Sequence, residues 1–227
     1  PPGVSSSFSN GTFTISGTPI LAGTFNYTVT TVGPCLQAFE TGTIKVNPNI
    51  TIALTSGAGS NIQTRCIDSA ITNITYAIGT GGTGATVTGL PTGVTGTFAS
   101  GVFTISGTPT QSGTFAYVVQ PVGPCNLATA SGTITVTPNS TITLTSGTNS
   151  NNQTKCLNTS ISNITYSIGG GGTGATVTGL PTGVAGVFSS GVFTISGTPT
   201  QAGTFGYTVT TTGPCAQASA SGTLIIN

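Results

Sequence analysis

The chain has 227 residues, of which 2% are charged and 36% hydrophobic, and its formal net charge is +1. It has no His, Met or Trp, and its charged side chains are Glu40, Lys45, Arg65, Asp68 and Lys155. Acid–base catalysis and activated nucleophiles therefore lack their usual groups. Zinc sites would have no histidine and calcium sites no cluster of carboxylates, and three cations are too few to neutralise a nucleic-acid backbone. We predict no enzyme activity, no catalytic residues, no cofactor or metal, and no nucleic-acid partner. Apolar runs fall short of the about 20 residues of a membrane span, so we expect no membrane insertion.

Sequence motifs recur through the chain at a constant period of about 90 residues, which is typical of tandem repeats. The sequence VGPC at 32–35 recurs at 122–125 and as TGPC at 212–215, and QTRC at 63–66 recurs as QTKC at 153–156. We predict the C-terminal half of one repeat at 1–48 and complete repeats at 49–138 and 139–227. We expect the whole to be an excised piece of a longer array.

Apolar residues alternate with Thr and other polar residues in short runs. In chain order, the runs are TFNYTVT (24–30), NITYAI (73–78), VFTIS (102–106), TITVT (133–137) and TITLT (141–145). A period of two indicates half-buried strands, and turn signals recur about every 8–12 residues. These features predict an all-β fold with about seven strands in each complete unit. We expect immunoglobulin-like β-sandwiches arranged end to end.

The repeats follow one another without a spacer. Prolines in VNPN (46–49) and TPNS (137–140) lie between the last strand of one unit and the first of the next. Proline fixes φ and removes a backbone donor, so short junctions of this kind predict limited flexing between units.

Each complete unit contains two cysteines at matching positions, Cys66 and Cys125 in the first and Cys156 and Cys215 in the second. Their spacing is compatible with a bridge across two sheets, so we predict the disulfides Cys66–Cys125 and Cys156–Cys215, with free buried thiols as the alternative. The partner of Cys35 is then expected upstream of Pro1. Disulfides are typical of proteins outside the cytosol.

The sequence GLPTGV at 89–94 followed by SGVFTISGTPTQSGTFAYVV at 100–119 resembles the PIG-type Ig-like repeat of bacterial surface proteins. The version with QTxC and GPC is similar to arrays in giant secreted proteins of Bacteroidota, many of them adhesins. The resemblance covers most of each unit and implies a β-sandwich stalk. It implies no ligand, since such repeats serve many proteins.

Three smaller features are candidate sites. The Gly-rich segment 79–89 precedes another strand and lacks a P-loop lysine, so we favour an exposed structural loop over a phosphate site. We interpret Arg65 and Lys155 as solvated edge charges that oppose aggregation, with a polyanion or glycan contact as the alternative. Ser69 lies in DSA (68–70), which resembles a Bacteroidota O-glycosylation pattern, and we consider it a possible glycosylation site.

The function these observations favour is mechanical. We predict a stalk segment of a large extracellular repeat protein, a cell-surface adhesin or surface filament, that holds a distal tip away from the cell. The alternatives are a carbohydrate- or protein-binding Ig-like module and a self-associating filament or surface-layer subunit. The expected partners are neighbouring repeats of the same chain, lateral copies, or host and surface glycans.

Overall fold

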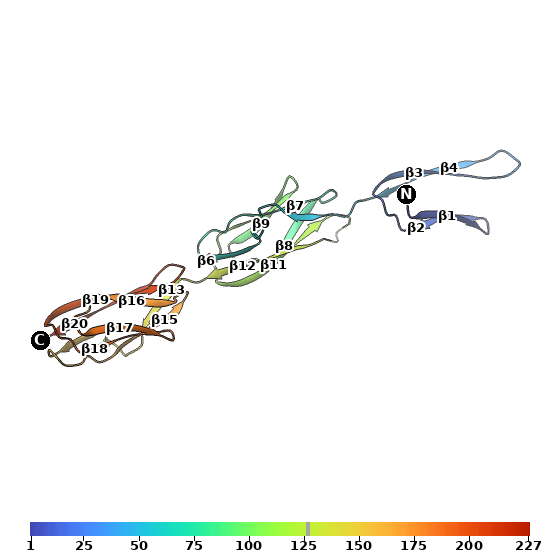
Figure 1. The fold of residues 1–227 in the computed structure, drawn as a ribbon. Helices are drawn as coiled ribbons and strands as arrows, with labels where there is room; N and C mark the ends of the chain where they lie inside the picture. Colours follow the sequence, from blue (N-terminus) through green and yellow to red (C-terminus); the bar gives the residue numbers. More distant parts are fainter. Residues whose placement is uncertain (126–127) are drawn as a thin grey trace.

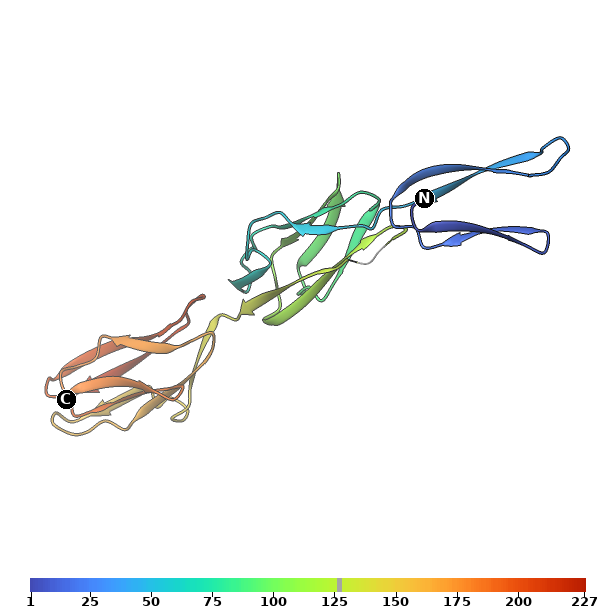
Figure 2. The same cartoon turned by 45° about the vertical axis from the view of Figure 1, so that its right-hand side comes forward.

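The computed structural model describes residues 1–125 and 128–227. Figures 1 and 2 show three units in a row, with the N-terminal segment in blue at one extremity and the C-terminus at the other. The described ranges contain strands and turns but no helix. A helix capable of crossing a membrane is accordingly not found among these residues. The predicted all-β fold class is confirmed.

The central unit is a sandwich of two four-stranded sheets. One sheet has the order β5-β7-β10-β9 and the other β6-β12-β11-β8. The strands are β5 (Ile52–Leu54), β6 (Ile62–Cys66), β7 (Ile74–Ile78), β8 (Gly84–Thr88), β9 (Val94–Ala99), β10 (Val102–Gly107), β11 (Gly113–Val122) and β12 (Ala130–Thr137). This order matches the two-sheet arrangement of immunoglobulin domains.

The central unit has eight strands rather than about seven because its first strand is divided. β5 pairs with β7 in one sheet, and after a turn the chain continues as β6, which pairs in parallel with β12 in the other sheet. The turn contains Gly57 and Gly59 at φ of 101° and 78°, values that favour glycine. This crossing sets the direction of β6.

The C-terminal unit repeats this topology. Its sheets have the orders β13-β15-β18-β17 and β14-β20-β19-β16, with β14 parallel to β20. The strands are β13 (Ser140–Leu144), β14 (Asn152–Lys155), β15 (Ile164–Gly170), β16 (Gly174–Thr178), β17 (Val184–Ser189), β18 (Val192–Gly197), β19 (Gly203–Thr212) and β20 (Ser219–Ile226).

The N-terminal segment forms two hairpins, one from β1 (Val4–Ser9) and β2 (Thr12–Gly17), the other from β3 (Gly23–Thr30) and β4 (Phe39–Val46). By the period of the repeat they correspond to β9–β10 and β11–β12. Phe13 is 44% exposed here, whereas the equivalent Phe103 is 2% exposed in the central unit. The hairpins therefore carry core residues without the strands that bury them elsewhere. The boundaries 1–48, 49–138 and 139–227 themselves stay a prediction.

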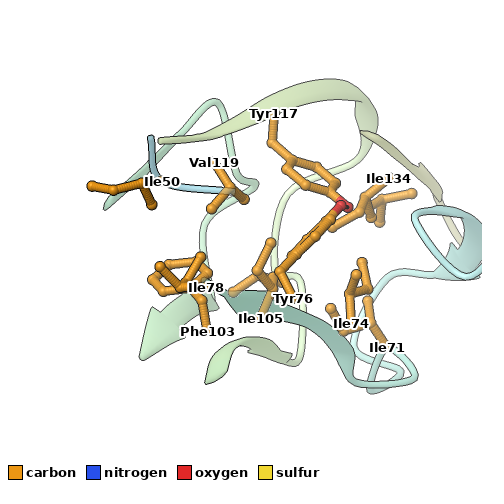
Figure 3. Packing of buried hydrophobic residues seen from close by; sticks show 12 residues of the cluster. Ile50, Ile71, Ile74, Tyr76, Ile78, Phe103, Ile105, Tyr117, Val119 and Ile134 are labelled. Carbon is orange, nitrogen blue, oxygen red and sulfur yellow. Dashed lines mark hydrogen bonds between the residues drawn. The ribbon is translucent and has the colours of Figure 1, made fainter. Parts of the chain in front are cut away.

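The core of the central unit consists of the residues that the period of two assigns to one face. Tyr76, Ile105 and Ile134 come from three different strands and are at most 1% exposed. Figure 3 shows these side chains pointing toward one another between the sheets. Alternation along a strand sends every second side chain inward, and burial of these large apolar groups stabilises the sandwich.

The Leu-Pro-Thr-Gly turn depends on its glycine. Gly93 has φ +88°, and a Cβ there would lie 2.1 Å from the carbonyl oxygen of Thr108. We expect Gly93→Ala to destabilise the central unit by at least about 2 kcal/mol in chemical denaturation, because backbone strain and a steric clash combine. Gly101→Ala is the control: φ is +79°, but the nearest atom is 4.0 Å away. Equal losses in the two variants would contradict this explanation.

Candidate functional site

The structure places a disulfide between two units. Cys66 of the central unit is bonded to Cys215 of the C-terminal unit, with a Cα–Cα distance of 5.5 Å and a sequence separation of 149 residues. The chain between the two units is short: β12 ends at Thr137 and β13 begins at Ser140. We call this region the junction, and we name the two ends of each unit by where the chain enters and leaves it.

The parallel pairing of β6 with β12 brings Cys66 to the exit end of the central unit. In the register of these strands Cys66 lies beside Thr137, the last residue of β12. The backbone N–H of Ile67 donates to the carbonyl of Thr137 at 2.9 Å and extends the pairing by one residue. An antiparallel strand in this place would end at the opposite end of the sandwich.

Cys215 reaches the same point from the other unit. It lies in the loop between β19 and β20, at the entry end of the C-terminal unit. Its Sγ lies 3.7 Å from the carbonyl oxygen of Thr137, and the adjacent Ala216 carbonyl accepts a 2.9 Å hydrogen bond from the N–H of Ser140. Both cysteines of the bridge are thus held against the residues that connect the units.

The predicted bridges Cys66–Cys125 and Cys156–Cys215 are wrong in this structure, where Cys35, Cys125 and Cys156 are free. Cys125 lies in the loop before β12, and Cys66 lies beside the end of that strand. The eight residues of β12 span roughly 27 Å at about 3.4 Å per residue, whereas a disulfide joins Cα atoms about 4.4–6.8 Å apart. The two cysteines of one unit therefore lie at opposite ends of it.

A hydrogen-bonded tyrosine pair joins the two sheets inside each complete unit. The hydroxyls of Tyr76 on β7 and Tyr117 on β11 are 2.9 Å apart, and those of Tyr166 and Tyr207 are 3.1 Å apart. Figure 3 shows the first pair meeting in the core. Antibody domains place a disulfide between the corresponding two strands. Within each complete unit, a hydrogen bond between two tyrosines therefore joins the sheets where a disulfide was expected.

Tyr117 also donates to the carbonyl of Asn61 at 3.4 Å, in the segment that precedes β6. Gly132 makes room for this contact, since a Cβ there would lie 2.4 Å from the Tyr117 hydroxyl. The bond ties side chain to backbone as in a tyrosine corner, but its acceptor is 56 residues away rather than a few. It fixes the start of the strand that carries Cys66.

Burial raises the pKa of Tyr76, Tyr117 and Tyr207 above the ordinary value of 10.0, and for Tyr117 and Tyr207 the hydroxyl of the paired tyrosine raises it further. A raised folded pKa means that the fold favours the neutral phenol, so this stabilisation is complete below pH 10 and is lost as the pH rises above it. We expect unfolding free energy to be flat between pH 5 and 9 and to fall above pH 10. Chemical denaturation and phenolate absorbance across pH 5–12 measure both effects, and normal titration of all tyrosines would contradict this.

The other sequence candidates divide between the junction and the strand edges. Arg65 and Lys155 lie on the edge strands β6 and β14 and donate to the hydroxyls of Thr72 and Ser162. Ser69 is exposed and lines a junction cleft of about 340 Å³ together with Arg65, Cys66 and Cys215. Its glycosylation stays a prediction.

The Gly-rich loop connects two strands, β7 and β8, and no helix follows it, so it lacks the strand-to-helix geometry of a phosphate loop. Within residues 1–125 and 128–227, no group of three or more His, Cys, Asp or Glu side chains is placed to hold a metal ion. The chemistry that the described residues do bring together is the covalent connection of two units. Closing a loop of 149 residues removes unfolded-state entropy worth about 5 kcal/mol in the chain-entropy treatment.

The solved structures with similar folds include tandem Ig domains. An I-band fragment of titin matches 79% of this chain with a TM-score of 0.58 and 11% identity, and this chain spans 66% of that fragment. A three-Ig-domain titin structure, in an E-to-A mutated variant, matches 100% of this chain and 83% of its own with a TM-score of 0.69 and 10% identity. No family model and no curated protein sequence matches the chain. At these identities the likeness shows the fold: tandem Ig-like β-sandwich domains.

Proposed function

We propose that the chain is a stalk segment of a large extracellular repeat protein, a bacterial cell-surface adhesin or surface filament of the PIG-type family. The observation that carries the proposal is the Cys66–Cys215 bridge, because a covalent bond between successive units resists both bending and separation at the junction. The near absence of ionisable groups suits a structural element whose shape does not respond to pH around neutrality. An oxidising location outside the cell is part of the same proposal.

Small-angle X-ray scattering tests the stalk. A compact protein of 227 residues has a radius of gyration of about 17 Å. We expect a clearly larger value and a pair-distance distribution with a long tail, as the row of units in Figures 1 and 2 requires. A value near that of a compact globule, with the units folded back on each other, would contradict a stalk.

A binding module is the second candidate, and the junction cleft favours it. Arg65 supplies a cation and Ser69 a hydroxyl beside the disulfide, a combination that suits an anionic sugar. A glycan array that includes sulfated and carboxylated sugars distinguishes the two functions. The stalk proposal predicts no binding, whereas binding abolished by Arg65→Ala would favour the module. Lateral contacts between copies would appear as concentration-dependent scattering.

A further inference from the structure

The free Cys156 is presented in the same way as the bonded Cys66. The N–H of Leu157 donates to the carbonyl of Asn227 at 2.8 Å, as that of Ile67 donates to Thr137 at 2.9 Å. Asp68 and Asn158, two residues beyond their cysteines, both have φ of 61° and both donate to a proline carbonyl, at 2.9 and 3.0 Å. The exposed thiol of Cys156 is therefore held at the exit end of the C-terminal unit in the geometry that forms a bridge one repeat earlier.

The free Cys125 matches the other half of the bridge. Its Sγ lies 3.9 Å from the carbonyl oxygen of Asn47, the residue that corresponds by the repeat to Thr137, and Cys215 Sγ lies 3.7 Å from Thr137. Cys125 thus occupies, between the N-terminal segment and the central unit, the place that Cys215 occupies at the junction of the central and C-terminal units. Both complete units have a strand-end cysteine at the exit and a Gly-Pro-Cys loop at the entry.

We propose that the exit end of the C-terminal unit is a docking site for the entry end of a further repeat of this type, and that Cys156 forms a disulfide with the Gly-Pro-Cys cysteine of that repeat. The inference rests on the proposed stalk function and adds its mode of assembly. The Cys66–Cys215 bridge carries the argument, because the same motif residues are already bonded across a junction of the same construction.

The bond forms by thiol–disulfide exchange with a protein or small-molecule disulfide as the oxidant. The Cys156 thiolate attacks one sulfur of that disulfide and expels the other as a thiolate, which leaves a mixed disulfide. The thiolate of the incoming Gly-Pro-Cys residue then attacks the Cys156 sulfur and expels the second thiolate. The two cysteine thiols lose two electrons and two protons, and the oxidant leaves as two thiols.

Such bridges overlap along an array and form two continuous covalent tracks. The chain from Cys125 to Cys156 is much shorter than the separation of 149 residues that each bridge closes. Each track therefore contains one such short segment and one disulfide for every two repeats. Successive bridges along the array belong to alternate tracks. Fully stretched, the segment from Cys125 to Cys156 reaches only about 105 Å, so unfolding of a unit cannot lengthen the stalk by the length of its whole chain.

A four-unit chain tests the docking site. A second copy of residues 138–227, appended after Asn227, continues the period and places the copied Cys215 at 149 residues from Cys156, the separation of the existing bridge. After oxidation with glutathione disulfide, thiol alkylation and digestion with trypsin without reduction, we expect the last fragment, which starts at the copied Cys156, to remain linked to the fragment that starts at Cys156. Cys156→Ser should release it.

The Cys66–Cys215 bridge of the same molecule serves as the internal control for folding. Release of the last fragment while this bridge is intact would overturn the docking proposal, and absence of both bridges would overturn it too, since the first is its template. Scattering separates this outcome from failure of the stalk. An elongated four-unit chain with an alkylated Cys156 refutes only the proposed disulfide between Cys156 and the next repeat. A compact chain refutes the stalk.

Discussion

Reduction of the Cys66–Cys215 disulfide should lengthen the fully stretched chain by about 500 Å, because it frees 149 residues that each span roughly 3.3–3.6 Å when extended. When the protein is pulled by its termini, the bridge diverts force from Cys66 to Cys215 and shields the 149 residues between them. Reduction exposes this segment to the force, and its stretched length accounts for the gain. Single-molecule force spectroscopy with and without a thiol reductant measures the difference in contour length directly.

Serine variants locate the bond that is responsible. Cys66→Ser in oxidising buffer should reach the length of the reduced wild type, while Cys125→Ser should leave the oxidised length unchanged because Cys125 is free. Bridges within units would behave differently. They would shield two separate loops, each about 200 Å long when stretched, and Cys125→Ser would release one of them.

Phe103→Ala should destabilise the central unit by about 3–5 kcal/mol, the usual loss when a buried phenylalanine is truncated and leaves a cavity. Phe103 is 2% exposed and packs between the sheets, as Figure 3 shows. Phe193→Ala should do the same to the C-terminal unit, since Phe193 is also 2% exposed. Denaturant unfolding followed by hydrogen exchange assigns each loss to its unit.

Phe13→Ala is the matched control, because Phe13 has the same position in the repeat but is 44% exposed. We expect a loss below about 1 kcal/mol and fast amide exchange throughout the N-terminal hairpins, which lack the strands that cover this face in the complete units. A loss for Phe13→Ala as large as that for Phe103→Ala would show that the hairpins have a closed core and contradict the structure.

Much of the fold could be predicted from local pattern. Alternation assigned Tyr76, Phe103 and Ile105 to the inner face, and all three are buried there. The division of the first strand into β5 and β6 could not be predicted in this way, because three and five residues are too few to show a period. The parallel pairing of β6 with β12 is a long-range contact, which the residues of β6 do not specify by themselves.

The disulfide was mispredicted because a spacing along the chain does not say at which end of a sandwich a residue lies. The spacing of Cys66 and Cys125 suits a bridge across the sheets only if both lie at the same end. A partial signal was present: Cys125 follows Gly-Pro in the loop of a hairpin, whereas Cys66 is the last residue of a strand. Pairing of β6 with β12 turns that signal into a bond between units.

Trypsin digestion of the denatured, unreduced and alkylated chain tests the bridge most directly. The three basic residues Lys45, Arg65 and Lys155 divide the chain so that Cys66 and Cys125 fall in fragment 66–155, and Cys156 and Cys215 fall in fragment 156–227. A bridge between units predicts that these two fragments are recovered as one species, with Cys35, Cys125 and Cys156 alkylated. Two separate fragments, each with an internal disulfide, would contradict it.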